Sequence, residues 1–296
     1  FWLSSYPKSG NTLLRSMLIA LFFTIDGKFE FEKFYQIQQF ERTSLLLKNK
    51  IIFGNDFKKL KNIPTIFKYL DKLQSKEALG LKQDFVFYKS HSGLFKIGDN
   101  SFTNKNNTRG IIYLLRDPRD VCLSWSKHNG ITINESIKFM LNDLSNLYWQ
   151  EPSNKPEVFK DSDRPRSFLS SWEKHVLSWT SINWEVPLLI IKFEDLVYNK
   201  QDTIIKIIQF FEKNYKFVFE NKDKKIENIL ESTSFLKLKK LEETKGFIEA
   251  TKHSRFFSVG KKKQWESKLN KSQINLIEKK FKNVMKKFGY NLKVEL

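Results

Sequence analysis

The sequence has 296 residues, and 40% of them are hydrophobic, including 28 Phe and 7 Trp. This length fits a single α/β domain, and the apolar content suffices for a sizeable core. Lys and Arg number 52 against 33 Asp and Glu, a net charge of +19. Such a charge attracts nucleotides, nucleic acid, acidic glycans and membrane surfaces alike. A lysine-rich compositional bias explains the charge equally well, so the charge does not indicate which class of ligand the protein binds.

Cys122 is the single cysteine, which excludes a framework of intramolecular disulfides. The longest apolar stretch, residues 17–23, is too short to span a membrane. No signal peptide is visible, and trimming before Phe1 stays open. We therefore expect a cytoplasmic protein without a membrane span, and the sequence does not indicate its oligomeric state.

The start of the chain predicts a strand, a tight loop and a helix. The apolar run Phe1–Tyr6 is short enough for a buried strand, and residues 13–23 have the length and spacing of a buried helix. N–H groups at a helix N-terminus lack internal partners and lie at the positive end of the helix dipole. Lys8 adds a cation, and Ser9 and Thr12 add hydroxyl donors. The segment therefore predicts a phosphate-binding loop.

This loop is not the common P-loop, which requires Gly, four residues, Gly, Lys and then Ser or Thr. Here the lysine comes two residues before the loop's glycine. The string YPKSGNT instead resembles the 5′-phosphosulfate loop of sulfotransferases that use 3′-phosphoadenosine 5′-phosphosulfate (PAPS). The alternative is an ordinary strand–turn–helix with a solvated lysine. The resemblance implies that five loop residues bind PAPS: Lys8, Ser9, Gly10, Asn11 and Thr12.

A second polar motif, Lys89-Ser90-His91, follows a β-rich run at residues 85–88. Parallel sheets present functional groups at the carboxyl ends of their strands. The string resembles the Lys-Thr-His of sulfotransferases. That resemblance implies that His91 is the general base, that Lys8 neutralises the leaving phosphate and that Lys89 supports the transferred group. A surface histidine after a strand is the alternative.

A third motif follows the apolar strand predicted at residues 111–115. Arg116 comes directly after this strand, and Ser124 lies eight residues further on, in a predicted helix. The arrangement resembles the sulfotransferase motif in which Arg and Ser at this spacing bind the 3′-phosphate. Arg suits the task because its planar guanidinium is bidentate towards phosphate. Alternatively, Arg116 pairs with one of the two aspartates of RDPRD.

The middle of the chain carries fewer signals. Residues 131–167 predict an amphipathic helix and then a loop at 151–166, which could cover an acceptor pocket. Residues 167–179 predict a further helix, in which His175 is expected to be structural rather than catalytic. Three residues on one face of that helix are expected in the core: Trp172, Val176 and Trp179.

Two later strings resemble the adenine-binding parts of the family. Phe193, in FEDL, stands where the family has Tyr, so a hydroxyl contact towards adenine is missing. Thr233 and Phe235 match the family's Thr-Ser-Phe, whose aromatic ring packs on the adenine. The alternative for that string is a helix N-cap with a core phenylalanine. Leu13 stands where the family commonly has an adenine-stacking Trp.

The string VGKKKQW resembles the last sulfotransferase motif, Arg-Lys-Gly followed by Trp, whose basic pair binds the 3′-phosphate. Gly260 fits that pattern, but Ser258 and Val259 replace the basic pair. A glycine turn followed by lysines also binds phosphate. Three lysines are therefore expected to substitute: Lys261, Lys262 and Lys263.

Together these motifs imply one sulfotransferase domain over residues 1–296. Its expected fold is α/β, with a mostly parallel central sheet flanked by helices and a nucleotide-binding site like that of P-loop proteins. The alternation of apolar strands and helices predicts the same class. The nucleotide is expected at the carboxyl ends of the strands.

The predicted function is sulfuryl transfer from PAPS to an acceptor hydroxyl or amine, with 3′-phosphoadenosine 5′-phosphate (PAP) as the product and no metal. We favour a carbohydrate or a small alcohol as acceptor, and expect no nucleic-acid partner and no membrane span. One alternative is a kinase or nucleotide-binding protein of the P-loop type, for which no Walker lysine is evident. The other is a non-catalytic basic protein that binds anions or nucleic acid, for which no recognition motif is evident.

Overall fold

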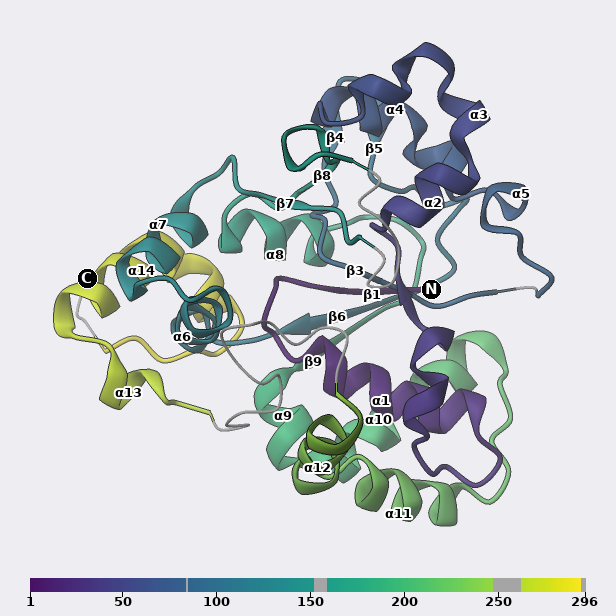
Figure 1. Ribbon diagram of the computed structural model, residues 1–296. Helices are drawn as coiled ribbons and strands as arrows, with labels where there is room; N and C mark the ends of the chain where they lie inside the picture. Colours follow the sequence, from purple (N-terminus) through teal and green to yellow (C-terminus); the bar gives the residue numbers. More distant parts are fainter. Residues whose placement is uncertain (84, 152–158, 247–261, 294–296) are drawn as a thin grey trace. The chain divides into compact units, whose positions relative to one another are not determined.

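A computed structural model describes residues 1–83, 85–151, 159–246 and 262–293 (Figure 1). Its central sheet has five strands in the order β2-β3-β1-β6-β9. Strands β1 and β3 run parallel, with Trp2 opposite Tyr88 and Ser4 opposite Ser90. The prediction of an α/β fold with a mostly parallel central sheet flanked by helices is confirmed. The strands span Trp2–Ser5 (β1), Gln38–Gln39 (β2), Tyr88–Ser90 (β3), Ile111–Leu115 (β6) and Leu188–Lys192 (β9).

Burial explains why the central strands lack an alternating pattern. Every residue of β1 and of β6 is buried. Strands of a parallel sheet are covered on both faces, so they become continuous apolar runs such as IIYLL in β6. The strand predicted at residues 111–115 is therefore found at its predicted bounds.

The chain divides into two compact units. Strands β6 and β9 both begin in the first unit and end in the second. The first unit contains residues 1–6, 39–113 and 139–188, and the second contains residues 7–38, 114–138 and 189–296.

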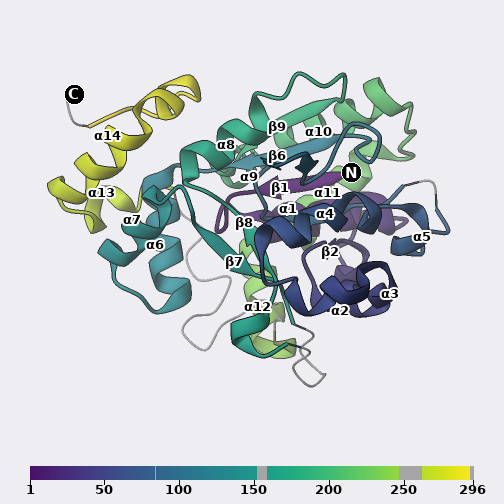
Figure 2. The same ribbon diagram turned by 90° about the horizontal axis from the view of Figure 1, so that it is seen from above.

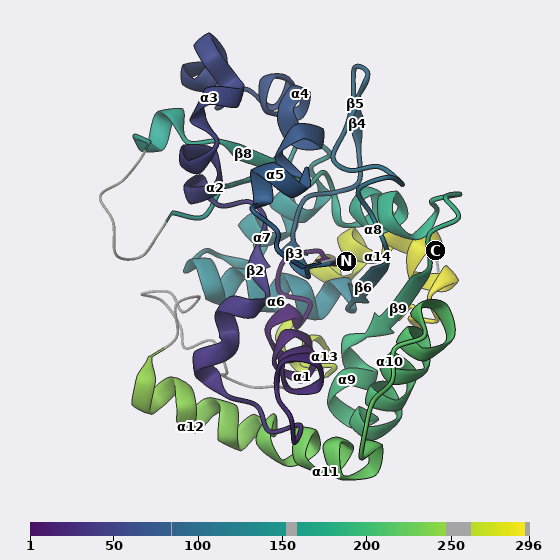
Figure 3. The same cartoon turned by 90° about the vertical axis from the view of Figure 1, so that its right-hand side faces the viewer.

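The first unit contains short helices and two small antiparallel hairpins. Helix α4 packs against strand β5 of one hairpin (Figure 3). Its helices are α2 (Thr43–Lys48), α3 (Lys50–Phe53), α4 (Ile63–Leu73), α5 (Lys76–Leu79) and α8 (Trp172–Thr180), with 3₁₀ turns η2 (Gly54–Lys59) and η3 (Asp161–Asp163). The hairpins are β4–β5 (Lys96–Ile97 and Asn100–Ser101) and β7–β8 (Asn146–Tyr148 and Arg166–Phe168). Helix α7 (Ile133–Leu141) belongs partly to each unit.

The second unit contains most of the longer helices. Helix α1 packs against α11 and the turn η1, and α6 packs against α13 and α14 (Figure 2). Rings of Phe22, Phe211, Phe217 and Phe219 meet edge to face within this unit. The elements are α1 (Asn11–Phe23), η1 (Phe31–Gln36), α6 (Pro118–Asn129), α9 (Phe193–Tyr198), α10 (Lys200–Tyr215), α11 (Lys222–Ser232), α12 (Phe235–Lys245), α13 (Trp265–Lys268) and α14 (Lys271–Lys287). None of the described helices is long and apolar enough to cross a membrane.

A buried ion-pair network joins the start of α6 to the C-terminal helices. Arg119 contacts Asp117 at 2.6 Å and Glu278 at 2.5 Å. Its guanidinium also lies 3.6 Å from the ring centroid of Trp265. Glu278 in addition accepts a hydrogen bond from the backbone N–H of Lys293. These contacts fix α13 and α14 beside the strand end that carries Arg116.

The strand predicted at residues 85–88 is displaced along the chain. The structure forms β3 only at Tyr88–Ser90, because its partner β1 begins at Trp2, which lies opposite Tyr88. The rings of Phe85 and Phe87 instead pack on Phe1. Lys89 therefore lies within the strand rather than after it, and the prediction was wrong there.

The prediction for residues 131–167 was partly wrong. Helix α7 ends at Leu141, and β7 then pairs antiparallel with β8. The next helix begins at Trp172, after its N-cap Ser171, because the residues before it are held in β8. The expected core residues of this helix are confirmed, since all three are fully buried: Trp172, Val176 and Trp179.

Candidate functional site

The loop that follows β1 has a backbone that suits glycine at one position. Lys8 and Gly10 both have a positive φ, 68° and 98°. Gly10 is the N-cap of α1. A Cβ at Gly10 would lie 2.5 Å from Cδ2 of Phe193, so both the backbone conformation and the lack of space favour glycine here.

The N-terminus of α1 has the properties of an anion site. Among the described residues, no side chain caps this helix and no acidic residue lies in its first turn. Ser9 and Thr12 are each only 1% exposed. Within the described chain, Ser9 Oγ is buried without a hydrogen-bond partner, which is costly unless a ligand supplies one. Asn11 is also buried in this first turn.

Arg116 lies beside the same loop. Its Nη1 donates to the backbone carbonyl of Lys8 at 2.9 Å, and its guanidinium lies 4.1 Å from the ring centroid of Phe193. In the described residues, its buried Nε has no hydrogen-bond partner, and no carboxylate pairs with it. Burial lowers the pKa of Arg116, an effect that the charge of Asp120 opposes. A buried cation with an unused donor is suited to a bound anion.

Among the described residues Arg116 forms no ion pair with either aspartate of RDPRD, although the charge of Asp120 acts on it. Asp117 caps α6 and pairs with Arg119 instead. Ser124 lies in the same helix, two turns beyond this cap, and is partly exposed. The structure thus places Arg116 and Ser124 in one strand–helix unit, as the sequence predicts.

Phe193 lies between the loop glycine and Arg116. It begins α9 and is buried. Its ring occupies the space that a Cβ on Gly10 would need, and it also lies against the guanidinium of Arg116. The ring therefore packs against both motifs of the second unit.

The Thr233–Phe235 segment has its predicted local structure, with one difference. Ser234 is the N-cap of α12, and Thr233 is buried, with its carbonyl accepting from Lys200 Nζ at 2.6 Å. Burial lowers the pKa of Lys200 to about 8. Phe235, however, is 36% exposed, so the alternative of a core phenylalanine is wrong.

The C-terminal motif is anchored by an aspartate that the sequence offered only as an alternative partner of Arg116. Asp120 accepts from the backbone N–H groups of Lys263 at 2.7 Å and Trp265 at 3.1 Å. The backbone N–H of Lys262 donates to Tyr198 Oη, and its Nζ lies 4.2 Å from that ring's centroid. Burial raises the pKa of Asp120, although Arg116 opposes the shift. The predicted cofactor residues Gly260 and Lys261 lie outside the described residues.

In the first unit, His91 follows β3 directly and is partly buried. Its Nδ1 lies 2.9 Å from the backbone oxygen of Ser5. Because a carbonyl only accepts, Nδ1 must carry the hydrogen, and in the neutral ring Nε2 then carries the lone pair. Lys89 is 5% exposed and lies opposite Leu3 in the β1–β3 ladder.

His175 supports His91 through the backbone. Its Nε2 lies 3.0 Å from the carbonyl oxygen of His91, and its Nδ1 lies 2.9 Å from Tyr113 Oη. The first contact requires Nε2–H, so Nδ1 accepts from the tyrosine hydroxyl. Burial lowers the pKa of His175 to about 4. The expectation of a structural role agrees with this geometry.

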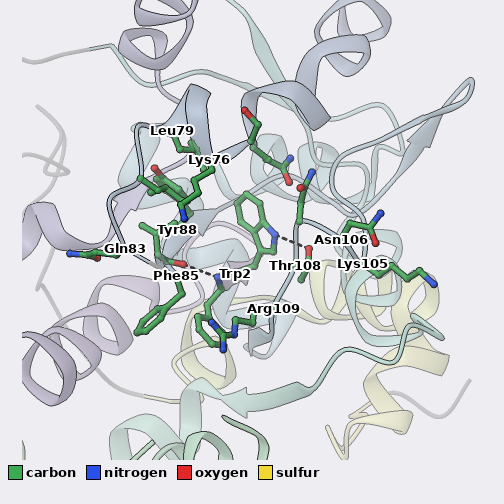
Figure 4. Close-up of a pocket in the computed structure, with 16 residues that line it drawn as sticks. Trp2, Lys76, Leu79, Gln83, Phe85, Tyr88, Lys105, Asn106, Thr108 and Arg109 are labelled. Atoms are coloured by element: carbon green, nitrogen blue, oxygen red, sulfur yellow. Dashed lines mark hydrogen bonds between the residues drawn. The ribbon is translucent and has the colours of Figure 1, made fainter. Parts of the chain in front are cut away.

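The first unit also contains a cavity of about 530 Å³, lined in part by Trp2, Phe85, Tyr88 and Arg109 (Figure 4). Trp2 Nε1 donates to Thr108 Oγ1 at 3.2 Å at its wall. The cavity lies where β1 and β3 begin, whereas the catalytic candidate of this unit follows the end of β3. Within the first unit, the cavity and His91 therefore lie at opposite ends of β3.

The predicted residues thus fall into two groups. The loop residues, Arg116, Phe193 and Lys262 belong to the second unit, and Lys89 and His91 belong to the first. In the described part of the chain, no group of three or more His, Cys, Asp or Glu side chains is arranged to hold a metal ion.

Comparisons with known proteins bear on this geometry. A family model described as a sulfotransferase domain matches residues 1–289. The chain is 24% identical over 174 residues to a 3-beta-hydroxysteroid sulfotransferase of Cavia porcellus, covering 59% of this chain and 53% of that protein. It is 23% identical over 237 residues to the luciferin sulfotransferase of Photinus pyralis, covering 80% and 55%. The chain therefore spans about half the length of the curated relatives it matches.

Among solved structures, retinol dehydratase in complex with androsterone and the inactive cofactor PAP is similar to this chain. The TM-score is 0.60 at 16% sequence identity, and the match covers 100% of this chain and 82% of that one. At this identity the likeness shows a shared fold.

Proposed function

The chain belongs to the sulfotransferase family, and from that premise we propose that it is an enzyme that transfers a sulfuryl group from PAPS to an acceptor hydroxyl or amine. The observation that carries the proposal is the pair of buried, unused donors beside the N-terminus of α1. Ser9 Oγ and Arg116 Nε have no hydrogen-bond partner among the described residues. Both are suited to the phosphate groups of one nucleotide.

The residues present fit the two ends of PAPS. We assign the 5′-phosphosulfate to the loop, through Lys8, Ser9 and the backbone of residues 10–12. We assign the 3′-phosphate to Arg116 and Ser124. Lys262, from the last motif, is assigned to the same phosphate. PAPS supplies the sulfuryl group, and PAP is the product.

The adenine is assigned to aromatic and small side chains of the second unit. Phe235 supports this assignment because its ring is exposed at the start of α12. Thr233 fixes the turn before it through the bond from Lys200. Phe193 contributes packing beside Arg116, without the hydroxyl that the family usually has there.

The chemistry assigned to the first unit is proton transfer. In the reaction the S–O bond to the donor phosphate breaks while an S–O or S–N bond to the acceptor forms. His91 Nε2 accepts the acceptor's proton, because Nδ1 is occupied as a donor to Ser5. Lys8 neutralises charge on the leaving phosphate, and Lys89 supports the transferred group. Such a loose, anionic transition state depends mainly on positioning and charge stabilisation.

Narrower expectations remain part of the proposal. We propose a carbohydrate or a small alcohol as acceptor, one sulfotransferase domain over residues 1–296, and a cytoplasmic location. The names of the relatives, which act on a steroid and a luciferin, support a small organic acceptor in general.

Calorimetry with PAP, ATP and a DNA oligomer tests the nucleotide assignment. We expect PAP to bind more tightly than ATP, and DNA to bind only weakly and with a strong salt dependence. Transfer of label from PAPS to a panel of sugars, alcohols, phenols and amines then tests the activity. Equal affinity for ATP and PAP, together with no labelled product from any acceptor, would contradict the proposal.

A further inference from the structure

The turn that carries His91 is held by a buried carboxylate from a distant part of the chain. Glu41 Oε1 accepts from Ser90 Oγ at 2.5 Å, from the backbone N–H of Ser92 at 3.1 Å and from Ser92 Oγ at 2.7 Å. Glu41 is fully buried. One carboxylate oxygen therefore fixes both residues that flank His91.

Helix α8 holds the same turn from another direction. His175 Nε2 donates to the carbonyl of His91 at 3.0 Å, and Trp179 Nε1 donates to the carbonyl of Ser92 at 2.9 Å. Tyr113 fixes the ring of His175 by donating to Nδ1. The backbone of the turn is thus bonded on successive residues by side chains that are all fully buried.

The buried carboxylate is an expensive way to stabilise a turn. Removing a carboxylate from water costs several kcal/mol unless hydrogen bonds replace the lost hydration. Within the described chain, Glu41 Oε2 has no hydrogen-bond partner, so only half of the group is compensated. An apolar residue would avoid that cost but would leave the Ser90 and Ser92 donors without this acceptor.

We infer that Glu41 and His175 are positioning residues for the transfer reaction, a role that rests on the proposed function. They hold the backbone on both sides of His91, so that its ring keeps the Nδ1–H bond to Ser5 and presents Nε2 as the base. Neither residue is assigned a contact with PAPS or the acceptor. Their effect passes through His91 alone.

Two variants at Glu41 and two at His175 distinguish the effect of losing the hydrogen bonds from the effect of changing the side-chain volume. Glu41→Gln keeps an oxygen that can accept the three bonds, whereas Glu41→Ala removes it. His175→Gln keeps an N–H that can reach the His91 carbonyl, whereas His175→Phe keeps ring volume without it. We expect the Ala and Phe variants to lose roughly 10- to 100-fold in kcat, as small misplacements of a catalytic group do.

The two Gln variants should stay within a few-fold of the parent in kcat. All four should bind PAP with the parent's Kd, because the PAP residues belong to the second unit. The decisive control is the His91→Ala background. There, Glu41→Ala should cause no further loss of kcat, since a positioning residue has nothing left to position. If Glu41→Ala lowered kcat by the same factor in the His91→Ala background as in the parent, the inference would be overturned.

An NMR measurement tests the inference without any activity. The chain has only four histidines, so their ring nitrogens can be assigned by single substitutions. We expect Nδ1–H for His91 and Nε2–H for His175 in the parent, and loss of the fixed His91 tautomer in His175→Phe and Glu41→Ala. An unchanged His91 tautomer in both variants would overturn the inference. Absence of transfer activity in a parent that shows these tautomers would instead count against the proposed function alone.

Should Glu41→Ala fail to fold, His175→Phe and Ser92→Ala provide the same test. Ser92→Ala removes one of the three bonds to Glu41 and leaves the backbone bond in place. It should lower kcat by a few-fold, with unchanged PAP affinity and no effect in the His91→Ala background. Full activity in both of these variants would contradict the positioning role.

Discussion

Arg116 donates a hydrogen bond from Nη1 to the backbone carbonyl of Lys8 at 2.9 Å. The residue assigned to the 3′-phosphate is thus bonded to the loop assigned to the 5′-phosphosulfate. One face of its guanidinium lies against Phe193. This bond joins two motifs that are 108 residues apart in the sequence, and it supports the proposal that both bind the same nucleotide.

The first prediction concerns this arginine. Arg116→Ala should weaken PAP binding by about 10- to 100-fold, since a charge-assisted pair contributes roughly 1.5–3 kcal/mol. Binding of adenosine 5′-phosphosulfate, which lacks the 3′-phosphate, should fall only slightly through the lost bond to Lys8. Arg116→Lys keeps the charge but not the bidentate guanidinium, so its affinity for PAP should lie between those of the parent and Arg116→Ala. Calorimetry with both nucleotides checks this, and equal losses would show that Arg116 does not bind the 3′-phosphate.

The second prediction compares two glycines with positive φ. Gly10→Ala should destabilise the protein by more than Gly98→Ala, although both force Ala into a left-handed conformation that costs about 1–2 kcal/mol. The difference is space: a Cβ at Gly10 would lie 2.5 Å from Phe193, whereas nothing lies within 4 Å of one at Gly98. Urea unfolding measures both losses. Equal losses of unfolding free energy would show that the Phe193 ring can move away from the new Cβ without destabilising the protein.

The third prediction concerns the proposed base. His91→Ala should lower kcat by about 10²- to 10⁴-fold, the usual effect of losing a general base. PAP affinity should be unchanged, because His91 lies in the unit without the assigned nucleotide residues. Steady-state kinetics and calorimetry on the same preparation check both parts. Parent-like turnover would remove His91 from the mechanism.

The fourth prediction is a pH dependence of stability from His175. Its pKa is about 4 in the fold and 6.5 without burial. Between these values the unfolded chain binds a proton that the folded chain excludes, so stability falls as pH drops from 6.5 to 4 and levels off below. The contribution is about 3 kcal/mol. In urea unfolding from pH 4 to 7, the free energy of unfolding should fall less on acidification in His175→Gln than in the parent. The same pH dependence in both proteins would contradict a lowered pKa of His175.

The sequence predicts those parts of the site that are contiguous in the chain. YPKSGNT and LLRDPRD each contain a strand end, a loop and a helix start, so the local pattern suffices to predict these two strand–loop–helix units. The strand of KSH was misplaced because its bounds depend on where β1 begins, which is not a local property. Hairpin β7–β8 was missed for a different reason, because each of its strands is only three residues long and carries too short a pattern to recognise.

The supporting residues escaped prediction because their contacts are distant in sequence. Glu41 lies 49 residues from Ser90, and Asp120 lies 143 residues from Lys263. Glu41 carries no motif at all, so nothing in the sequence distinguishes it from a solvated glutamate. Asp120 stood within RDPRD, and its place in the first turn of α6 was the available signal. Burial and hydrogen bonding, which only the fold reveals, separate these carboxylates from the others.

The last prediction concerns the lysines that replace the family's basic pair. Lys262 is held by Tyr198 through its backbone N–H and its Nζ, and the backbone of Lys263 is held by Asp120. Both side chains are exposed, so their attraction for a phosphate is screened over about 10 Å at 0.1 M salt. Replacing Lys261–Lys263 with Ala should therefore weaken PAP binding at low salt and flatten its salt dependence.

A charge-matched control separates local contact from the field of the whole protein. Replacing three lysines of α14 with Ala removes the same charge from a helix without an assigned nucleotide residue: Lys279, Lys280 and Lys286. Calorimetry from about 30 to about 300 mM salt, a roughly tenfold range of ionic strength, should show a larger loss of PAP affinity for the Lys261–Lys263 variant than for this control. If that variant binds PAP as tightly as the parent at low salt, the lysines do not substitute for the basic pair. The 3′-phosphate would then depend on Arg116, Ser124 and backbone amides, and the fixed backbone of Lys263 would serve only to join Trp265 to α6.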